Sequence, residues 1–114
     1  MTDCLFCKKS NGQIPARIVY QDDKAMAFED IHPEAPIHVI IIPKKHIPTV
    51  LDITDEDQDA IGYLYLVAKR IAIDKSLAED GFRLVVNCGK FGGQEIPHIH
   101  IHMLGGRLFG WPPG

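Results

Sequence analysis

The sequence feature that most constrains the fold is the segment His98-Ile99-His100-Ile101-His102-Met103-Leu104, in which histidine alternates with an apolar residue. Successive side chains of a strand point to opposite faces of a sheet, so the three imidazoles share one face and the apolar side chains share the other. On a helix, positions i and i+2 point about 200° apart, which would scatter the histidines. The alternation therefore predicts a β-strand over residues 99–104, with an apolar face in the core.

The imidazole face has three interpretations from the residues alone. It can be a solvated or hydrogen-bonded polar face. It can bind a metal, although ligands must converge to about 2.1 Å from one ion, and His98 and His102 of an extended strand lie about 13 Å apart, so two neighbours can share an ion but three cannot. It can be a row of titratable groups along a substrate, which suits acid–base and nucleophilic chemistry near neutral pH.

Four further strands are predicted from β-branched and apolar runs. Residues 17–21 and 24–29 are typical of two strands joined by a turn at Asp22-Asp23. A β-branched run over residues 38–42 ends at Pro43 and indicates a buried central strand. Residues 82–87 complete the set, and short turns between these segments favour antiparallel pairing.

The helices are predicted from capping and periodicity. Thr54 and the acidic residues after it can cap a long helix over about residues 55–78. Its apolar stripe follows i, i+3, i+4 spacing: Ile61, Leu64, Tyr65, Ala68, Ile71 and Ala72. A short helix over residues 4–12 precedes the sheet. The chain of 114 residues is therefore expected to form one α+β domain over residues 1–114, with a five-stranded antiparallel sheet, one long helix and a short N-terminal helix.

Charge and composition exclude some partners. A formal charge of −3 gives no polycation for long DNA or RNA. The longest apolar run, residues 39–42, is far short of the about 20 residues of a membrane span. The first four residues lack the basic start and apolar stretch of a secretory leader. With three cysteines, an odd number, a disulfide framework is not expected, and we expect a cytoplasmic location.

A glycine-rich segment precedes the histidines at residues 89–94, Gly-Lys-Phe-Gly-Gly-Gln. Flexible glycines let successive backbone N–H groups turn toward one anion, as in a phosphate-binding nest. The spacing is not that of a P-loop, and an ordinary β-turn is the alternative. Next to three histidines, the segment favours phosphate as the group that the imidazoles face.

The alternating motif closely resembles the signature of the histidine-triad family. The similarity extends over nearly the whole chain and includes residues 14–16, 28–31, 36–38, 42–46, 92–94, 104–107 and 111–114. The resemblance implies a HIT-like fold and a place in that family's branch of small nucleotide-binding homodimers. It also implies hydrolysis of purine nucleoside phosphoramidates, derivatives of AMP or GMP, through a nucleotidyl intermediate on the middle histidine.

Carried over residue by residue, the resemblance makes His100 the nucleophile and places His102 on the phosphate oxygens. His98 and His38 would belong to a proton relay. A backbone carbonyl would hold one ring nitrogen of the nucleophile protonated and leave the other with its lone pair. From the residues alone, His38 can equally be a hydrogen-bonded core histidine.

The same resemblance implies a set of binding residues. Phe6, Phe28 and Ile31 would enclose the base, Asp30 would accept from the ribose hydroxyls, and Trp111 would lie near the leaving group. The phosphate side would be held by Asn87, Gly93, Gln94 and Glu95. Phe28 and Ile31 can instead be core residues, and Asp30 can simply start a turn. Glu95 replaces a serine of animal members, and a carboxylate near phosphate is unfavourable unless it points away or is protonated.

Cys4 and Cys7 have the spacing of a zinc knuckle, but two thiolates alone do not make a structural site. The resemblance implies His46 and His98 as the other two ligands. Two buried cysteines or a redox pair are the alternatives. Three functions stay open: a phosphoramidate hydrolase, a dinucleoside polyphosphate hydrolase, and a zinc-stabilised nucleotide-binding module without turnover.

Overall fold

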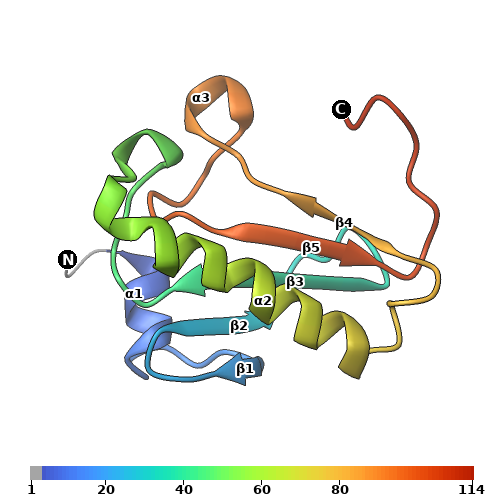
Figure 1. The fold of residues 1–114 in the computed structure, drawn as a ribbon, viewed down its shortest axis with the longest axis horizontal. Coiled ribbons are helices and arrows are strands. Elements are labelled where there is room, and N and C mark those ends of the chain that lie inside the picture. Colours follow the sequence, from blue (N-terminus) through green and yellow to red (C-terminus); the bar gives the residue numbers. More distant parts are fainter. Residues whose placement is uncertain (1–3) are drawn as a thin grey trace.

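A computed structural model describes residues 4–114. The prediction about a secretory leader rested on residues 1–4, and the first three of these lie outside the described residues. Within residues 4–114 the chain forms a five-stranded antiparallel sheet in the order β1-β2-β3-β5-β4 (Figure 1). The strands are β1 (Ile18–Gln21), β2 (Ala25–Glu29), β3 (Ile37–Pro43), β4 (Phe82–Val85) and β5 (Ile101–Gly105). The predicted sheet is confirmed, and its central strand is β3, the β-branched run.

The long helix is confirmed, with different ends. A 3-10 turn over Asp55–Asp57 leads into α2 (Gln58–Asp74), which ends four residues before the predicted Ala78. Ser76 adopts a left-handed φ of 61°, and the N–H of Leu77 bonds back to the carbonyl of Ala72 at 2.8 Å. This backbone arrangement closes the helix.

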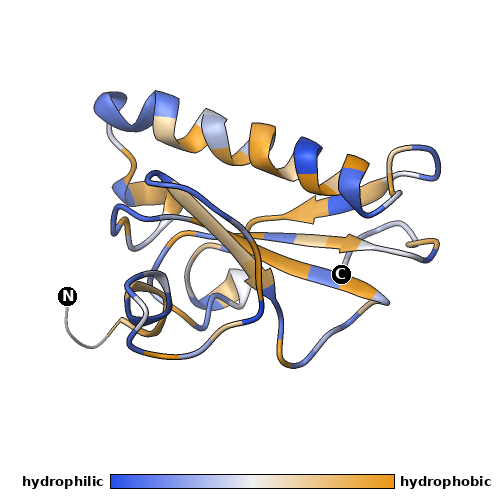
Figure 2. Cartoon of the chain, turned by 90° about the horizontal axis from the view of Figure 1, so that it is seen from below, coloured by the Kyte–Doolittle hydropathy of each residue, from blue (hydrophilic) through white to orange (hydrophobic). Residues whose placement is uncertain are grey.

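Helix α2 covers one face of the sheet and buries an apolar stripe against it (Figure 2). The buried side chains of the helix are Leu64, Val67, Ala68, Ile71 and Ala72. Tyr65, predicted in this stripe, is half exposed, and Val67 takes its place. Val67 lies three residues after Leu64 and four before Ile71, so it shares their side of the helix.

The other face of the sheet carries a smaller core under α1 (Leu5–Ser10). Its members are Cys4, Phe6, Met26, Phe28, Ile40 and Ile42. In β3, His38 is on this face because it is two residues from Ile40, and in β5, His102 is on it because Ile101 and Met103 pack toward α2. The sheet therefore separates a helix-covered core from a face that presents histidines.

The segment before β5 departs from a regular strand. The N–H of His98 bonds to the carbonyl of Ile96, and that of Ile99 bonds to the carbonyl of Ile47. Pairing with β3 begins only at Ile101, two residues later than predicted, and pairing with β4 begins at His102. The glycine-rich segment forms one short helical turn, α3 (Gly89–Gly92). Within residues 4–114, no helix combines the length and apolar character needed to cross a bilayer.

Candidate active site

The three histidines of the motif do not form the continuous row that an extended strand predicts. His100 and His102 are neighbours, with ring centroids 4.9 Å apart. His98 is fully buried, and its Nδ1 lies 3.3 Å from the sulfur of Cys4. The irregular backbone before β5 turns this first ring away from the other two, so the motif serves two adjoining sites.

The ring of His100 is oriented by a main-chain group. Its Nδ1–H donates to the carbonyl oxygen of His98 at 2.7 Å. The neutral ring therefore carries its lone pair on Nε2. Burial lowers the pKa of His100, although the hydrogen bond to the His98 carbonyl opposes that effect. The edge contact with Phe6, at 5.0 Å between ring centroids, helps to fix the ring. His100 is thus a neutral imidazole with a free Nε2.

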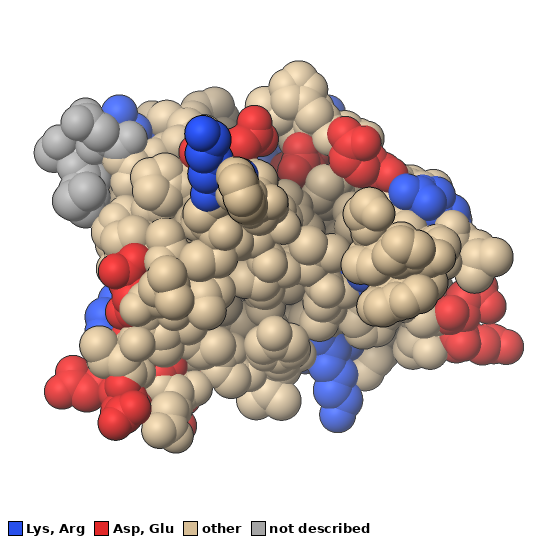
Figure 3. Space-filling model, turned by 90° about the horizontal axis from the view of Figure 1, so that it is seen from above, with Lys and Arg blue, Asp and Glu red and all other residues tan. Residues whose placement is uncertain are grey.

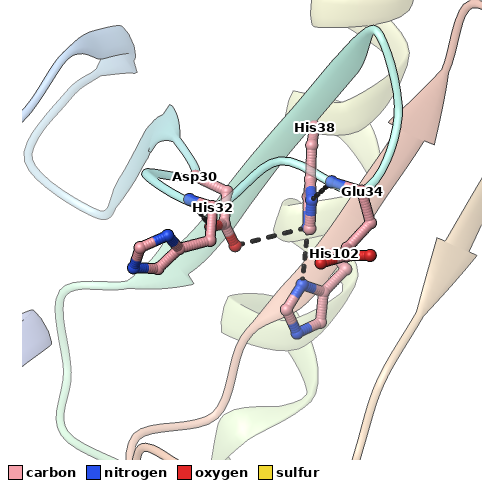
Figure 4. A network of polar contacts seen from close by, with 5 residues as sticks. All are labelled: Asp30, His32, Glu34, His38 and His102. Atoms are coloured by element: carbon pink, nitrogen blue, oxygen red, sulfur yellow. Dashed lines mark hydrogen bonds and ion pairs between the residues drawn. The ribbon is translucent and has the colours of Figure 1, made fainter.

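His38 and His102 form a hydrogen-bond chain on the same face (Figure 4). The backbone N–H of Glu34 donates to Nδ1 of His38 at 3.0 Å. A neutral ring with an accepting Nδ1 has its proton on Nε2. Nε2 of His38 lies 2.9 Å from Nδ1 of His102, so His38 donates and His102 accepts. Burial, followed by the charges of His100 and His38, lowers the pKa of His102 to about 4. A neutral His102 then carries its proton on Nε2.

Asp30 has two roles in the structure. Its Oδ1 accepts the backbone N–H of His32 at 2.7 Å, which is the turn predicted as the simpler alternative. Its Oδ2 lies 3.4 Å from Nε2 of His38, so a carboxylate group stands beside the hydrogen-bond chain of His38 and His102. The carboxylate also lines a cavity of about 570 Å³ together with Ile31 and His38. A ligand in this cavity therefore meets a carboxylate next to His38.

A second cluster brings two thiols and two imidazoles within 4.8 Å of one another: Cys4, Cys7, His46 and His98. Nδ1 of His98 lies 3.3 Å from Nδ1 of His46 and 3.5 Å from Sγ of Cys7. Zn–N bonds of about 2.0–2.1 Å and Zn–S bonds of about 2.3 Å give tetrahedron edges of about 3.3–3.8 Å. The spacing of these atoms therefore fits a tetrahedral zinc ion.

Protonation in this cluster also fits a metal. Nε2 of His98 lies 2.8 Å from the carbonyl oxygen of Pro43, to which it donates, so its lone pair is on the Nδ1 that faces the thiols. Burial and the hydrogen bond with Cys4 raise the pKa of Cys7 to about 11. The thiol is thus protonated at neutral pH unless a cation binds. Both ring nitrogens of His98 are engaged here, which leaves none for the proton relay predicted for it.

Asp30, His38 and His102 also bring ligand atoms within 4.8 Å of one another. A metal at this place would need the lone pair of Nε2 of His38. The N–H of Glu34 instead requires the lone pair on Nδ1, which puts the proton on Nε2. These three residues therefore fit a hydrogen-bond chain better than a metal site.

The structure places the predicted base-binding residues near one another but not all in the same environment. Phe6 and Phe28 are buried core residues with ring centroids 5.3 Å apart. Ile31 is 75% exposed at the cavity, so it is not a core residue. Trp111 is 84% exposed in the C-terminal tail, which extends away from the sheet beyond β5 (Figure 1). Within one chain, Trp111 is not brought to the histidines.

Gln94 holds the loop beside the histidines. Its side-chain amide donates to the carbonyls of Pro48 and Ile96, and its Oε1 accepts the N–H of Gly89. Its polar atoms are therefore engaged with the backbone. Gly93 ends α3 at a left-handed φ of 78°, which suits a residue without a side chain. The other two residues of this predicted set are the half-buried Asn87 and the exposed Glu95.

Sequence reasoning missed the main-chain partners of the site. The amide of Glu34 and the carbonyls of Pro43 and His98 set the proton positions on three histidines. Backbone groups occur at every residue, so no residue type signals them. The sequence did contain one relevant hint, because Pro43 ends the strand and places its carbonyl beside the first triad position.

Comparison with known proteins agrees with this geometry. The HIT domain family model matches residues 11–108. The purine nucleoside phosphoramidase of Escherichia coli is 49% identical over 108 residues, covering 95% of this chain and 91% of that protein. A crystal structure of a HIT family hydrolase from Legionella pneumophila matches with a TM-score of 0.97 at 50% identity, covering 98% of this chain and 100% of that chain. A histidine triad nucleotide-binding protein from Candida albicans matches with a TM-score of 0.83 at 31% identity, covering 96% and 83%.

An antiparallel sheet with a long helix on one face and alternating histidines on the other is the architecture of the histidine-triad class of proteins. The chain belongs to the HIT domain family. The resemblance drawn from the motif and the HIT-like fold class are thereby confirmed.

Proposed function

We propose that this protein hydrolyses the P–N bond of purine nucleoside 5′-phosphoramidates through a nucleotidyl intermediate on His100. The observation that carries the proposal is the 2.7 Å hydrogen bond from His100 Nδ1 to the His98 carbonyl. It leaves the Nε2 lone pair of a neutral imidazole as the available nucleophile. The E. coli relative, a purine nucleoside phosphoramidase, supports the substrate class.

The reaction proceeds in two displacements at phosphorus. In the first, the Nε2 lone pair of His100 bonds to the α-phosphorus while the P–N bond breaks, and the departing nitrogen takes up a proton from the solvent. In the second, water adds to phosphorus, the bond to Nε2 breaks, and the water gives a proton back to the solvent. The products are an amine and a nucleoside monophosphate, and His100 returns to its starting state.

His102 is assigned to the phosphoryl oxygens. The chain from the Glu34 amide through His38 leaves a proton on Nε2 of His102, where it can donate to developing negative charge. His38 acts through His102, because it determines which nitrogen of His102 carries the proton. His102 donates as a neutral ring, because its pKa is lowered to about 4.

The direct test is release of amine from adenosine 5′-phosphoramidate or a tryptamine conjugate. His100→Ala should reduce turnover at least about 1,000-fold while nucleoside monophosphate still binds. Rapid quenching and mass spectrometry of the wild-type enzyme should locate a nucleotidyl adduct on His100. His32→Ala, which removes an exposed imidazole, is the matched control. An adduct on His102, or full activity in His100→Ala, would refute the assignment.

A structural zinc ion is part of the proposal. The ligand set is Cys4, Cys7, His46 and His98, and thiolates favour zinc over magnesium or calcium. When bound, the ion would supply a cross-link between α1 and the segments after β3 and before β5, not chemistry at phosphorus. Elemental analysis of protein purified without chelators should find about one zinc per chain. Protein that contains no zinc and takes up none would contradict this assignment.

A homodimer is the proposed assembly. Leu66 and Ile73 of α2 are 54% and 58% exposed. Strand β4 is an edge strand, and Phe82 at its start and Val86 just after its end are partly exposed. The view over α3 and β4 shows charged side chains around the rim and few in the centre (Figure 3). Light scattering should give about twice 12.7 kDa, and Ile73→Glu should shift the mass toward the monomer.

The exposed tail would then reach the partner's active site. Trp111 would lie near the leaving group of the substrate bound by the partner. Deletion of residues 108–114 should therefore change activity or leaving-group preference, and an unchanged enzyme would exclude this role. A cytoplasmic location and a single domain over residues 1–114 also stay predictions.

A further inference from the structure

The mechanism leaves unexplained a lysine at the base-binding end of the site. Nζ of Lys9, in the last turn of α1, lies 4.6 Å from the centroid of the Phe28 ring. An ammonium over an aromatic face is held by cation–π attraction. Among residues 4–114, no carboxylate lies within ion-pair distance of Lys9. Its N–H groups are therefore available to a ligand.

Lys9 lines the same cavity as Asp30, Ile31 and His38, which has a volume of about 570 Å³. A nucleotide with its phosphate at the histidines and its ribose at Asp30 has its base toward Lys9 and Ile31. Ile31 is 75% exposed and offers an apolar surface to a flat ring. Lys9 then meets the edge of the base, not its face.

Purine bases differ at this edge. Guanine and hypoxanthine present O6 and N7, two adjacent acceptors, and a lysine ammonium donates to both. Adenine presents N7 beside the N6 amino group, which is itself a donor. We propose that Lys9 selects 6-oxopurine nucleotides over adenine nucleotides. This inference rests on the proposed function for the placement of ribose and phosphate.

The expected effect is a moderate preference. Direct contacts of this kind discriminate bases by about 1–3 kcal/mol. Because Lys9 is only half buried, water competes for its ammonium, and the lower end of the range applies. We therefore expect GMP and IMP to bind about fivefold more tightly than AMP, which corresponds to about 1 kcal/mol.

Calorimetric titration of GMP, IMP and AMP into the wild-type protein and Lys9→Met tests this proposal. The methionine keeps an apolar stem over Phe28 and removes the ammonium, so the preference should disappear through weaker GMP and IMP binding. Lys9→Arg should retain it. IMP lacks the 2-amino group of GMP. If IMP bound as weakly as AMP, the preference for GMP would depend on the 2-amino group, and the proposal would be overturned.

Arg17→Gln is the matched control. Arg17 lines the same cavity, but its side chain is 84% exposed and lies 3.8 Å from Glu29. All three ligands carry the same phosphate charge, so this change should alter their affinities equally and keep the ratio. A preference that persists in Lys9→Met, or equal binding of AMP and GMP to the wild type, would refute the role of Lys9. Lys9-dependent binding without P–N cleavage would support this inference and contradict the proposed hydrolase.

Discussion

The half-buried imidazole of His102 makes the stability of this protein sensitive to acid. Burial lowers its pKa to about 4, whereas a histidine in an unfolded chain has a pKa of about 6.5. Above about pH 6.5, the residue is neutral in both states and contributes no pH dependence. Below that value, the unfolded chain takes up a proton that the folded chain does not. The free energy of unfolding therefore falls between about pH 6.5 and pH 4.

The size of the effect follows from the two pKa values. At about pH 5, proton linkage to these two values destabilises the folded state by about 2 kcal/mol. His102 keeps some contact with water, so about half of this, roughly 1 kcal/mol, is the realistic contribution. His102→Asn removes the titrating ring, and its Oδ1 can still accept from Nε2–H of His38.

The assay is urea unfolding at about pH 7.5 and about pH 5. The loss of stability between the two conditions should be about 1 kcal/mol smaller in His102→Asn than in the wild type. His98 and His100 are present in both proteins, so their contributions cancel. His32→Asn removes an exposed imidazole and should leave the wild-type difference in place. Equal pH dependence in His102→Asn and the wild type would refute the argument from burial.

Three further predictions concern the frame around the site. Ser76→Gly should raise the free energy of unfolding by about 0.5–1 kcal/mol in urea, because glycine adopts the left-handed φ of 61° without steric cost; a decrease would contradict this. Gly105→Ala should lower it by about 1–3 kcal/mol, since a Cβ there would lie 2.7 Å from the Leu77 side chain; an unchanged midpoint would show that Leu77 moves freely. Cys7→Ser should lose zinc in elemental analysis and abolish any effect of chelators on the thermal midpoint; Cys88→Ser, outside the cluster, is the control.

Local patterns predicted the elements of this fold well. The alternation in residues 100–103 does place Ile101 and Met103 in the core and His100 and His102 on the other face. The β-branched run around Ile41 is the centre of the sheet. These predictions succeed because side-chain direction follows from backbone period alone.

Element ends and hydrogen-bond partners were not predictable in the same way. Helix α2 ends at Asp74 because the backbone after it turns to pack Leu77 into the core, and helix propensity does not contain that information. His98 turns toward the thiols because residues 96–99 bond to irregular segments instead of a ladder. Such departures depend on contacts between segments that are distant in sequence, and local sequence patterns do not indicate those contacts.

The oxygen that orients His100 belongs to the main chain, so it is the same oxygen whatever side chain stands at position 98. Point substitutions can remove the imidazole of His98, but none can delete its carbonyl. A lineage can therefore lose the metal ligands, one after another, without losing the hydrogen-bond partner of its nucleophile. The two functions of position 98 are separable by mutation even though they occupy a single residue.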